Sequence, residues 1–545
     1  MKKVLVLLLL VSSCLSMYSN NIEIKVSKKY LNIPVSHKID RARMTIDVNG
    51  VEERSFVIRL ATEEPDYWVF CDVSEFKGKT IKINYEGNNA GLSKIYQDDK
   101  IEGEDGIYKE VNRPQFHFTT KRGWINDPNG LIYHDGEYHL YYQYNPYERE
   151  WENMHWGHAV SKDLIHWEEL PIALYPDQHG TMYSGSAVID YDNTAGYNKG
   201  DTPAMVAIYT AAAPDRQVQC IAYSLDKGRT FTKYDKNPII DSKEIWNTVD
   251  TRDPKVFWYE PGNHWVMALN ERDGHSIYTS DNLKDWKYES HITGFWECPE
   301  LFELPVDGDP NNTKWVMYGA TGTYMLGSFD GKTFTPEAGK YYYTRGSIYA
   351  AQTFTNIPDS DGRRIQIGWG RVSHPDMPFN GMMLLPTELT LHTTKEGVRM
   401  FNNPVKETEQ LFTPVNKWSS MTSGEANDKL KEFYNADVLR IKTTFKLSHA
   451  TSAGINLFGQ HLIDYDMNGN TINGVFYSPE DRTSMELTAD IYIDKTSIEV
   501  FIDGGAYSYS MEYRPHNGNT EGFHFWGNNI EVKNLEVFSV KSIWE

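Results

Sequence analysis

Hydrophobic and polar residues alternate in short runs along most of the chain, and Gly, Asn and Asp residues bound these runs. Apolar residues rarely recur at the three- to four-residue spacing of an amphipathic helix. A period of two is typical of a half-buried β-strand. The sequence therefore predicts an all-β chain, with clear strands at 136–145, 204–212, 264–270, 314–321 and 364–370.

One turn pattern recurs four times, and each copy reads serine, then a polar turn, then an aromatic residue. The aromatic residues of successive copies lie 64, 55 and 48 positions apart. A repeat of roughly 50 residues with several short strands per unit is typical of propeller blades. About five blades fit between residues 112 and 405. The four copies occupy 161–167, 224–231, 280–286 and 328–334.

Two further series of short strands flank this region. We expect residues 20–108 to form a small N-terminal β-sandwich-like domain and residues 411–545 a C-terminal β-sandwich. The catalytic propeller is then expected over residues 109–410. A short helix is predicted at 403–412, where the two larger domains meet.

The first residues predict an export signal at 1–19. Two lysines precede an apolar run and a group of small residues, which is the layout of a secretory signal peptide. The run ends at Cys14 in a pattern that resembles a bacterial lipobox, with Cys14 as the lipidated first residue of the mature protein. Ordinary signal cleavage beyond Cys14 is the alternative. The expected location is the periplasm or cell surface, with membrane attachment only through this lipid.

The formal net charge of −21 limits the classes of binding partner that we expect for this chain. No basic run occurs, so nucleic acid and anionic membrane surfaces are excluded as expected partners. Cys71, Cys220 and Cys298 are odd in number and widely spaced, which does not predict a disulfide framework. The chain is rich in Tyr, Phe and Trp, as expected of a β-rich core and of a surface that stacks on sugar rings.

Three short motifs each place a carboxylate beside an unusual neighbour. Asp127 lies in "WINDPNG", Asp253 in "TRDPKVFW", and Glu297 and Glu300 in "WECPELFEL". A residue before proline is driven into extended geometry, which fixes the direction of its side chain at a strand end. Innermost propeller strands line one channel, so these carboxylates are expected to converge.

Converging carboxylates in an aromatic funnel indicate glycoside hydrolysis. One ionised carboxylate attacks the anomeric carbon or positions water, a second protonates the leaving oxygen, and a third stabilises the positive charge on the ring. Arg252 is expected to favour the ionised form of its neighbour Asp253. The motif itself leaves open whether Glu297 or Glu300 faces the channel.

Six motifs occur in a fixed order: "WINDPNG", "YYQYNP", "WGHAVSKDLIHW", "YSGSAV", "RDPKVFW" and "WECPELF". Together they resemble glycoside hydrolase family 32, the fructan hydrolases and invertases. The resemblance covers residues 112–400 and extends to the C-terminal β-sandwich. It implies a five-bladed propeller and a retaining double displacement on β-fructofuranosides. Residues 20–108 lie outside the two-domain plan and resemble an extra β-domain of some bacterial exo-acting members.

The resemblance also implies roles for individual residues. By motif position, Asp127 is similar to the nucleophile, Asp253 to the transition-state stabiliser and Glu297 to the acid/base, which decides against Glu300. No metal and no organic cofactor is implied. The residues that match the substrate-binding positions are Asn126, Gln143, Trp151, Tyr183, Ser184, Arg252 and Trp369.

The expected activity is exo-acting hydrolysis that releases fructose from levan, inulin and sucrose. The alternatives are an endo-levanase or endo-inulinase, a fructosyltransferase, and a catalytically silent propeller that binds fructan. Intact carboxylates argue against the silent propeller, and an exported protein fits scavenging of fructan better than its synthesis. The preference between β-2,6 and β-2,1 linkages depends on loop shape, and the sequence predicts neither it nor the oligomeric state.

Overall fold

The computed structural model consists almost entirely of β-strands, which confirms the all-β prediction. It divides into two compact units, residues 1–104 and 105–545. The expected signal segment 1–19, with Cys14, lies outside the described residues. No helix within the described part has the length and apolar content needed to cross a membrane. The structure describes residues 20–447, 452–477, 486–514, 522–527 and 529–544.

The first unit contains two antiparallel sheets. Their apolar side chains are fully buried, for example Ile46 and Ile83 in one sheet and Leu31 and Ile33 in the other. This is the small sandwich-like domain that the sequence predicts. One sheet has the order β1 (Asn21–Lys25), β6 (Thr80–Tyr85), β3 (Ala42–Val48), β4 (Val51–Ile58). The other has the order β5 (Tyr67–Asp72), β2 (Tyr30–Val35), β7 (Tyr96–Asp98).

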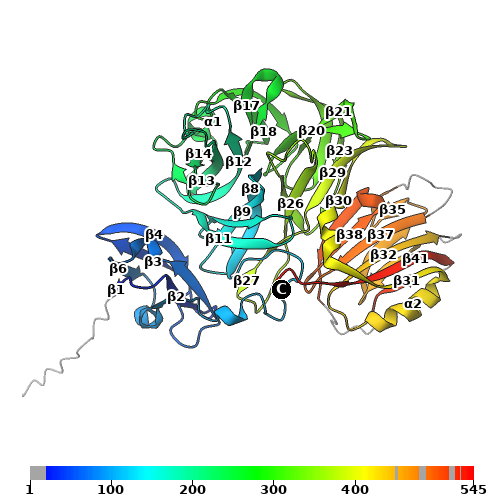
Figure 1. Cartoon of the computed structure of the whole chain (residues 1–545), viewed down its shortest axis with the longest axis horizontal. Helices are drawn as coiled ribbons and strands as arrows, with labels where there is room; N and C mark the ends of the chain where they lie inside the picture. Colours follow the sequence, from blue (N-terminus) through cyan, green and yellow to red (C-terminus); the bar gives the residue numbers. More distant parts are fainter. Residues whose placement is uncertain (1–19, 448–451, 478–485, 515–521, 528, 545) are drawn as a thin grey trace, which may run out of the picture. The chain divides into compact units, whose positions relative to one another are not determined.

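The second unit begins with five four-stranded antiparallel blades, as predicted (Figure 1). Blade 1 comprises β8 (Gly123–His134), β9 (Glu137–Asn145), β10 (His155–Ser161) and β11 (Trp167–Leu174). Blade 2 comprises β12 (Thr181–Asp190), β13 (Ala204–Ala213), β14 (Arg216–Ser224) and β15 (Thr232–Lys233). Blade 3 comprises β16 (Thr251–Tyr259), β17 (His264–Glu271), β18 (Gly274–Ser280) and β19 (Lys287–Thr293).

The last two blades are joined into a single nine-stranded sheet. One parallel pair, Val306 with Leu391, makes the link. Blade 4 comprises β20 (Glu300–Val306), β21 (Asp309–Tyr318), β22 (Thr323–Phe329) and β23 (Phe334–Tyr342). Blade 5 comprises β25 (Ile348–Thr353), β26 (Arg364–Gly370), β29 (Thr387–Thr394) and β30 (Gly397–Pro404), with β28 (Met382–Met383) beside β26. A short strand, β27 (Phe379–Asn380), pairs with β8 of blade 1.

The recurring turn joins the third and fourth strands in each of the first four blades. In blade 1 the hydroxyl of Ser161 bonds to Asp163, and the indole N–H of Trp167 donates to the Leu164 carbonyl at 2.9 Å. Trp286 makes the same contact in blade 3, to the Leu283 carbonyl at 3.1 Å. The repeat seen in the sequence is therefore a structural repeat, in which the aromatic ring closes the hairpin.

In blades 1, 3 and 4 the outermost strand is less buried than the strands inside it. The inner strands β13 and β17 are buried along almost their whole length, because neighbouring blades cover both faces of each sheet. The outermost strand β23 is largely exposed. The ring closes through a backbone bridge in which Thr355 N–H donates to Leu131 and Thr355 C=O accepts from Tyr133, at 2.9 and 3.0 Å.

The C-terminal part of this unit is the predicted β-sandwich. The predicted helix at 403–412 is a short 3-10 helix, η5 (Lys406–Leu411), and α2 (Ser423–Leu430) begins with a capping box from Thr422. The larger sheet has the order β24 (Arg345–Gly346), β39 (Tyr507–Glu512), β38 (Ser497–Ile502), β37 (Glu486–Ile493), β32 (Leu439–Leu447), β41 (Ile530–Val540), β31 (Phe412–Thr422). The smaller sheet has the order β36 (Val475–Phe476), β35 (Thr471–Ile472), β34 (Gln460–Asp466), β33 (Ser452–Leu457), β40 (His524–Trp526).

A buried histidine ties the propeller to the sandwich. His117 precedes the first blade, and its Nδ1 and Nε2 lie 2.8 Å from Asp494 and 2.7 Å from Glu499 of the sandwich. All three side chains are buried. Burial opposes protonation of the imidazole, but the hydrogen bonds and charges of the two carboxylates outweigh it and raise the pKa of His117 to about 9. The histidine is therefore a cation between two anions at neutral pH.

We predict that His117→Gln destabilises the second unit by about 3–5 kcal/mol, because two buried carboxylates lose their cation. A raised histidine pKa stabilises fully below its ordinary value of 6.5, and this contribution is lost as the pH rises through about 9. The difference in Tm between wild type and variant should be largest near pH 6 and shrink toward pH 10. His461→Gln, at an exposed site, is the control. A difference in Tm that is constant with pH would contradict the charged histidine.

Candidate active site

In blades 1, 2, 3 and 5 the hydrogen-bond register of the innermost strand shifts near the start of that strand. In blade 4 the backbone instead bends shortly before the innermost strand. Such a β-bulge leaves residues unpaired and redirects their side chains. In blade 4, Glu297 and Cys298 have φ of 51° and 43° and immediately precede β20. The register shifts in the other blades lie between Ile125 and Pro128, Met182 and Gly185, Arg252 and Lys255, and Tyr349 and Gln352.

Asp127 lies in the bulge of blade 1. Its Oδ2 accepts from the Ser184 hydroxyl of blade 2 at 2.7 Å, and its Oδ1 accepts from the amide of Asn126 at 3.1 Å. The indole N–H of Trp124 holds Asn126 in turn, at 2.8 Å. Burial raises the pKa of the Asp127 carboxyl, and the hydrogen bonds from Ser184 and Asn126 oppose this rise.

Asp253 lies in the bulge of blade 3 with a left-handed φ of 65°. Its N–H donates to the Thr210 hydroxyl at 3.1 Å, and its Oδ2 accepts from the Cys298 N–H at 3.0 Å. Burial raises its pKa to about 7, and the charges of Asp127 and Glu297 add to the rise. Arg252 lowers the pKa, as expected from the sequence. The expected effect of Arg252 is therefore present, but burial outweighs it.

Glu297 is held at three points. Its N–H donates to the Asn270 side chain at 2.8 Å. Its Oε1 accepts from Arg252, with Nη2 at 2.8 Å and Nε at 3.2 Å, and its Oε2 accepts a short hydrogen bond from the Tyr349 hydroxyl of blade 5. A left-handed residue other than glycine costs of order 1–3 kcal/mol, so these bonds keep Glu297 in a conformation it would not adopt alone.

Cys298 joins the carboxylates of blades 1 and 3. Its sulfur lies 3.6 Å from Asp253 Oδ2 and 3.8 Å from Asp127 Oδ2. The three possible ligand atoms lie within 4.8 Å of one another, so these are the described residues that could approach a metal together. Burial and the neighbouring carboxylates raise the pKa of the thiol well above its ordinary value. The thiol therefore stays protonated and can donate a hydrogen bond, whereas metal binding would need the thiolate.

Glu300 lies below this cluster instead of in it. Its Oε1 is 2.8 Å from Lys255 Nζ, and its Oε2 accepts from the Thr353 hydroxyl at 2.5 Å. Lys255 also donates to the Thr353 carbonyl at 2.6 Å, and all three residues are buried. Lys255, Glu300 and Thr353 therefore satisfy one another as a buried, paired group. Of the two glutamates in the motif, Glu297 is therefore the one beside Asp127 and Asp253.

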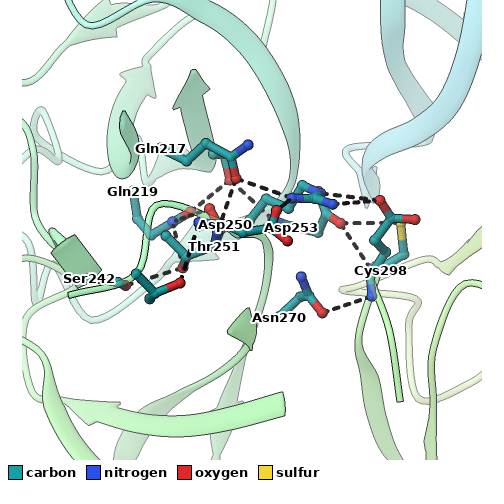
Figure 2. Close-up of polar contacts among 12 residues, drawn as sticks. Gln217, Gln219, Ser242, Asp250, Thr251, Asp253, Asn270 and Cys298 are labelled. Atoms are coloured by element: carbon teal, nitrogen blue, oxygen red, sulfur yellow. Dashed lines mark hydrogen bonds and ion pairs between the residues drawn. The ribbon is translucent and has the colours of Figure 1, made fainter. Parts of the chain in front are cut away.

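A polar network supports blade 3 behind the cluster (Figure 2). Gln217 Oε1 accepts from the N–H of Thr251 at 3.0 Å and from Arg252 at 3.2 Å. Ser242 donates to the Thr251 hydroxyl at 3.1 Å, and Asp250 pairs with Arg252. Arg252 is thus held by partners on both sides, which directs its guanidinium at Glu297.

The other predicted site residues surround the cluster. Gln143 donates to the Met182 carbonyl at 2.8 Å, just before the bulge of blade 2. Trp151, about half exposed, packs edge-on against Tyr183 with ring centroids 6.0 Å apart. Trp369 packs edge-on against Trp124, which holds Asn126; these two centroids lie 5.8 Å apart. These contacts link Gln143 and Trp151 to the segment that carries Ser184, and they link Trp369 to the partner of Asn126. Ser184 and Asn126 both bind Asp127.

Two residues of the cluster do not appear among the predicted ones. Tyr349 and Asn270 bind Glu297 directly, yet they belong to blades 5 and 3 and lie outside the six motifs. The only signal available in the sequence is positional, because Tyr349 follows the fourth turn and begins the innermost strand of the last blade.

The arrangement suits acid–base chemistry. Burial, with the charges of neighbouring carboxylates, raises the pKa of Asp127 and brings that of Asp253 to about 7, so the cluster keeps a proton near neutral pH. A reaction that needs one carboxylic acid and one carboxylate side by side can use such a site.

Comparison with known proteins agrees with this geometry. The family described as "Glycosyl hydrolases family 32 N-terminal domain" matches residues 117–404, and a domain of unknown function (DUF4980) matches residues 18–113. A levanase of Bacillus subtilis (strain 168) is 40% identical over 494 residues, covering 81% of this chain and 72% of the levanase. An extracellular exo-inulinase of Aspergillus niger is 33% identical over 519 residues, covering 80% and 96%.

Solved structures give the same relationship. The crystal structure of exo-inulinase from Aspergillus awamori aligns with a TM-score of 0.68 and 28% identity, covering 80% of this chain and all of the inulinase. A fructofuranosidase from Schwanniomyces occidentalis in complex with fructosylnystose aligns with a TM-score of 0.65 and 28% identity, covering 80% and 99%.

We predict that Asp253→Asn makes the folded chain more stable at pH 8. A carboxyl whose pKa rises from 3.8 to about 7 on folding opposes folding once it is ionised. This penalty is absent below pH 3.8 and complete above about pH 7. The variant should therefore match wild type near pH 4 and gain about 2–4 °C in Tm at pH 8. Asp192→Asn, at an exposed site, should show no such trend. A lower Tm for Asp253→Asn at pH 8 would refute the argument.

Proposed function

This chain belongs to glycoside hydrolase family 32, and on that basis we propose that it is an exo-acting β-fructofuranosidase that releases fructose from fructans and sucrose. The observation that carries the proposal is the convergence of carboxylates from three blades, joined by Cys298 and Arg252. Relatives named as a levanase, an exo-inulinase and an invertase support the substrate class.

In the proposed reaction each carboxylate has one role. Asp127 attacks the anomeric carbon and forms a fructosyl-enzyme, while Glu297 protonates the leaving glycosidic oxygen. Glu297 then takes a proton from water, which releases fructose with its configuration retained. Asp253 binds hydroxyls of the fructosyl ring and stabilises the positive charge that develops on it. Substrate is bound by Asn126, Gln143, Trp151, Tyr183, Ser184, Arg252 and Trp369.

Exo action is supported by relatives named exo-inulinases, one from Aspergillus niger at 33% identity and one from Aspergillus awamori whose crystal structure aligns with a TM-score of 0.68. The endo-acting alternative is therefore not favoured. The preference of the enzyme for β-2,6 or β-2,1 linkages is to be measured by comparing its rates on levan and inulin.

We further propose the division into an N-terminal domain (20–108), a propeller (109–410) and a sandwich (411–545). Export is supported by relatives named extracellular exo-inulinases. Lipid attachment through Cys14 is part of the same proposal, and it rests on the sequence pattern alone.

Asp127→Asn should abolish fructose release, with a loss of at least about 10³-fold in kcat, because the carboxylate is the proposed nucleophile. Its Tm should stay at or above that of wild type, since burial already opposes ionisation of this carboxyl. The measurement is fructose release from sucrose beside a thermal unfolding scan. Near-normal turnover in a folded variant would rule out the nucleophile.

Incubation with levan, inulin and sucrose should yield fructose as the only new product from either polymer at early times. Chromatography of the products checks this, and the relative initial rates on levan and inulin give the linkage preference. A ladder of oligosaccharides would instead demonstrate endo action. NMR of the first product tests retention, which requires the β-anomer to appear first.

A further inference from the structure

The fifth blade contributes a side chain to the site that no family role accounts for. Tyr349 lies at the register shift of β25, next to Ala350, whose φ is 51°. This is the position at which the other blades present Asp127, Ser184, Asp253 and Glu297. The hydroxyl of Tyr349 reaches across to blade 4 and donates to Glu297 Oε2.

The ring of Tyr349 is held on two sides. Trp369, its cross-strand partner, packs edge-on with centroids 6.3 Å apart and ring planes at 82°. The guanidinium carbon of Arg371 lies 4.8 Å from the ring centroid, and Arg371 itself is tied by its N–H to the Ser347 carbonyl at 2.9 Å. These contacts fix the direction in which the phenol hydroxyl points.

The two oxygens of Glu297 therefore have chemically different partners. Oε1 faces Arg252, whose guanidinium can donate hydrogen bonds but cannot accept one. A proton on Oε1 would face the N–H groups of Arg252, and the hydrogen bonds that these groups donate to Oε1 would be lost. Oε2 faces the Tyr349 hydroxyl, which can donate to a carboxylate and accept from a carboxylic acid. The proton of neutral Glu297 is thereby directed to Oε2.

We propose that Tyr349 is a positioning residue that makes Glu297 Oε2 the oxygen that gives up and regains the catalytic proton. The inference rests on the proposed function, because it concerns the acid/base step of that reaction. It adds a role for the fifth blade, which otherwise contributes only Trp369 to substrate binding.

The proton balance follows through both half-reactions. In the first, the proton leaves Oε2 for the glycosidic oxygen as the bond from that oxygen to the anomeric carbon breaks and the bond to Asp127 forms. Tyr349 then donates to the newly ionised Oε2. In the second, water adds to the anomeric carbon, its proton returns to Oε2, and the bond to Asp127 breaks. The tyrosine hydroxyl turns to release Oε2 at that point.

Tyr349 keeps its own proton and stays neutral throughout. Burial and the hydrogen bond to Glu297 raise the pKa of its phenol above the ordinary value of 10. The other groups that act on Glu297 stay in place when only the hydroxyl is removed. They are Arg252 with its partner Asp250, and the carboxylates of Asp127 and Asp253, which interact with Glu297 through their charges.

The test is Tyr349→Phe, which removes the hydroxyl and keeps the ring. Without this donor the ionised form of Glu297 is less stable, so the carboxyl keeps its proton to higher pH and gives it up less readily. We expect the upper limb of the pH profile of kcat/KM on sucrose to move up by about one pH unit. kcat on sucrose should fall about tenfold. Tyr342→Phe, at an exposed tyrosine of β23, is the matched control and should leave both unchanged.

A double-mutant cycle separates this role from simple packing. In the Glu297→Gln background Tyr349 has no carboxylate to act on, so adding Tyr349→Phe should change kcat/KM on an aryl β-fructofuranoside by less than about twofold. A thermal scan verifies that both variants fold.

The outcomes are distinct. An upper limb that does not move in Tyr349→Phe would overturn the inference, as would an equal loss of rate in the Glu297→Gln background. A wild-type protein that releases no fructose from any of the three substrates would instead overturn the proposed function.

Discussion

Every part of the site depends on the distortion of the backbone at the start of the innermost strands. A regular strand would point successive side chains to opposite faces and would bury half of the site between the blades. The distortions turn Asp127, Asp253 and Glu297 into the channel instead. Such conformations are costly, and they persist because polar groups from other strands satisfy the displaced N–H groups. Thr210 does this for Asp253, and Asn270 does it for Glu297.

These supporting groups connect one blade to the next, so the site exists only in the closed ring. Ser184 of blade 2 holds Asp127 of blade 1, and Cys298 of blade 4 reaches both Asp127 and Asp253. Each blade alone would leave its carboxylate without the partners that the other blades supply. The same arrangement buries Asp253 and places like charges beside it, and burial with the added repulsion raises its pKa to about 7, which makes the site a cost to folding at neutral pH. A site that needs both an acid and a carboxylate tolerates this cost because it keeps a proton where the reaction uses one.

The scaffold offsets this cost away from the chemistry. Lys255 and Glu300 pair with each other, and Thr353 satisfies their remaining hydrogen bonds, so this buried pair adds no net charge. At the sandwich, protonated His117 lies between Asp494 and Glu499. Both groups are buried ions with complete partners, whereas the catalytic carboxylates share donors and lack compensating cations apart from Arg252. The difference in pairing separates residues that hold the fold from residues that are available for reaction.

The sequence by itself determined the elements and indicated the candidate reacting groups. Strand periodicity and the serine-to-aromatic turn predicted the blades, because both are local patterns that every blade repeats. The motif around Asp127 predicted a directed side chain, because proline restricts the residue before it. The strand end that it also predicted is wrong, since β8 continues through Asp127 from Gly123 to His134. Tertiary structure decided what depends on neighbours distant in the chain. In the folded protein, burial raises the pKa of Asp253 although Arg252 lowers it. The fold also pairs Glu300 with Lys255 and brings Tyr349 to Glu297. Burial, charge repulsion and hydrogen-bond geometry arise only when five blades close around one channel, so no local pattern could have predicted them.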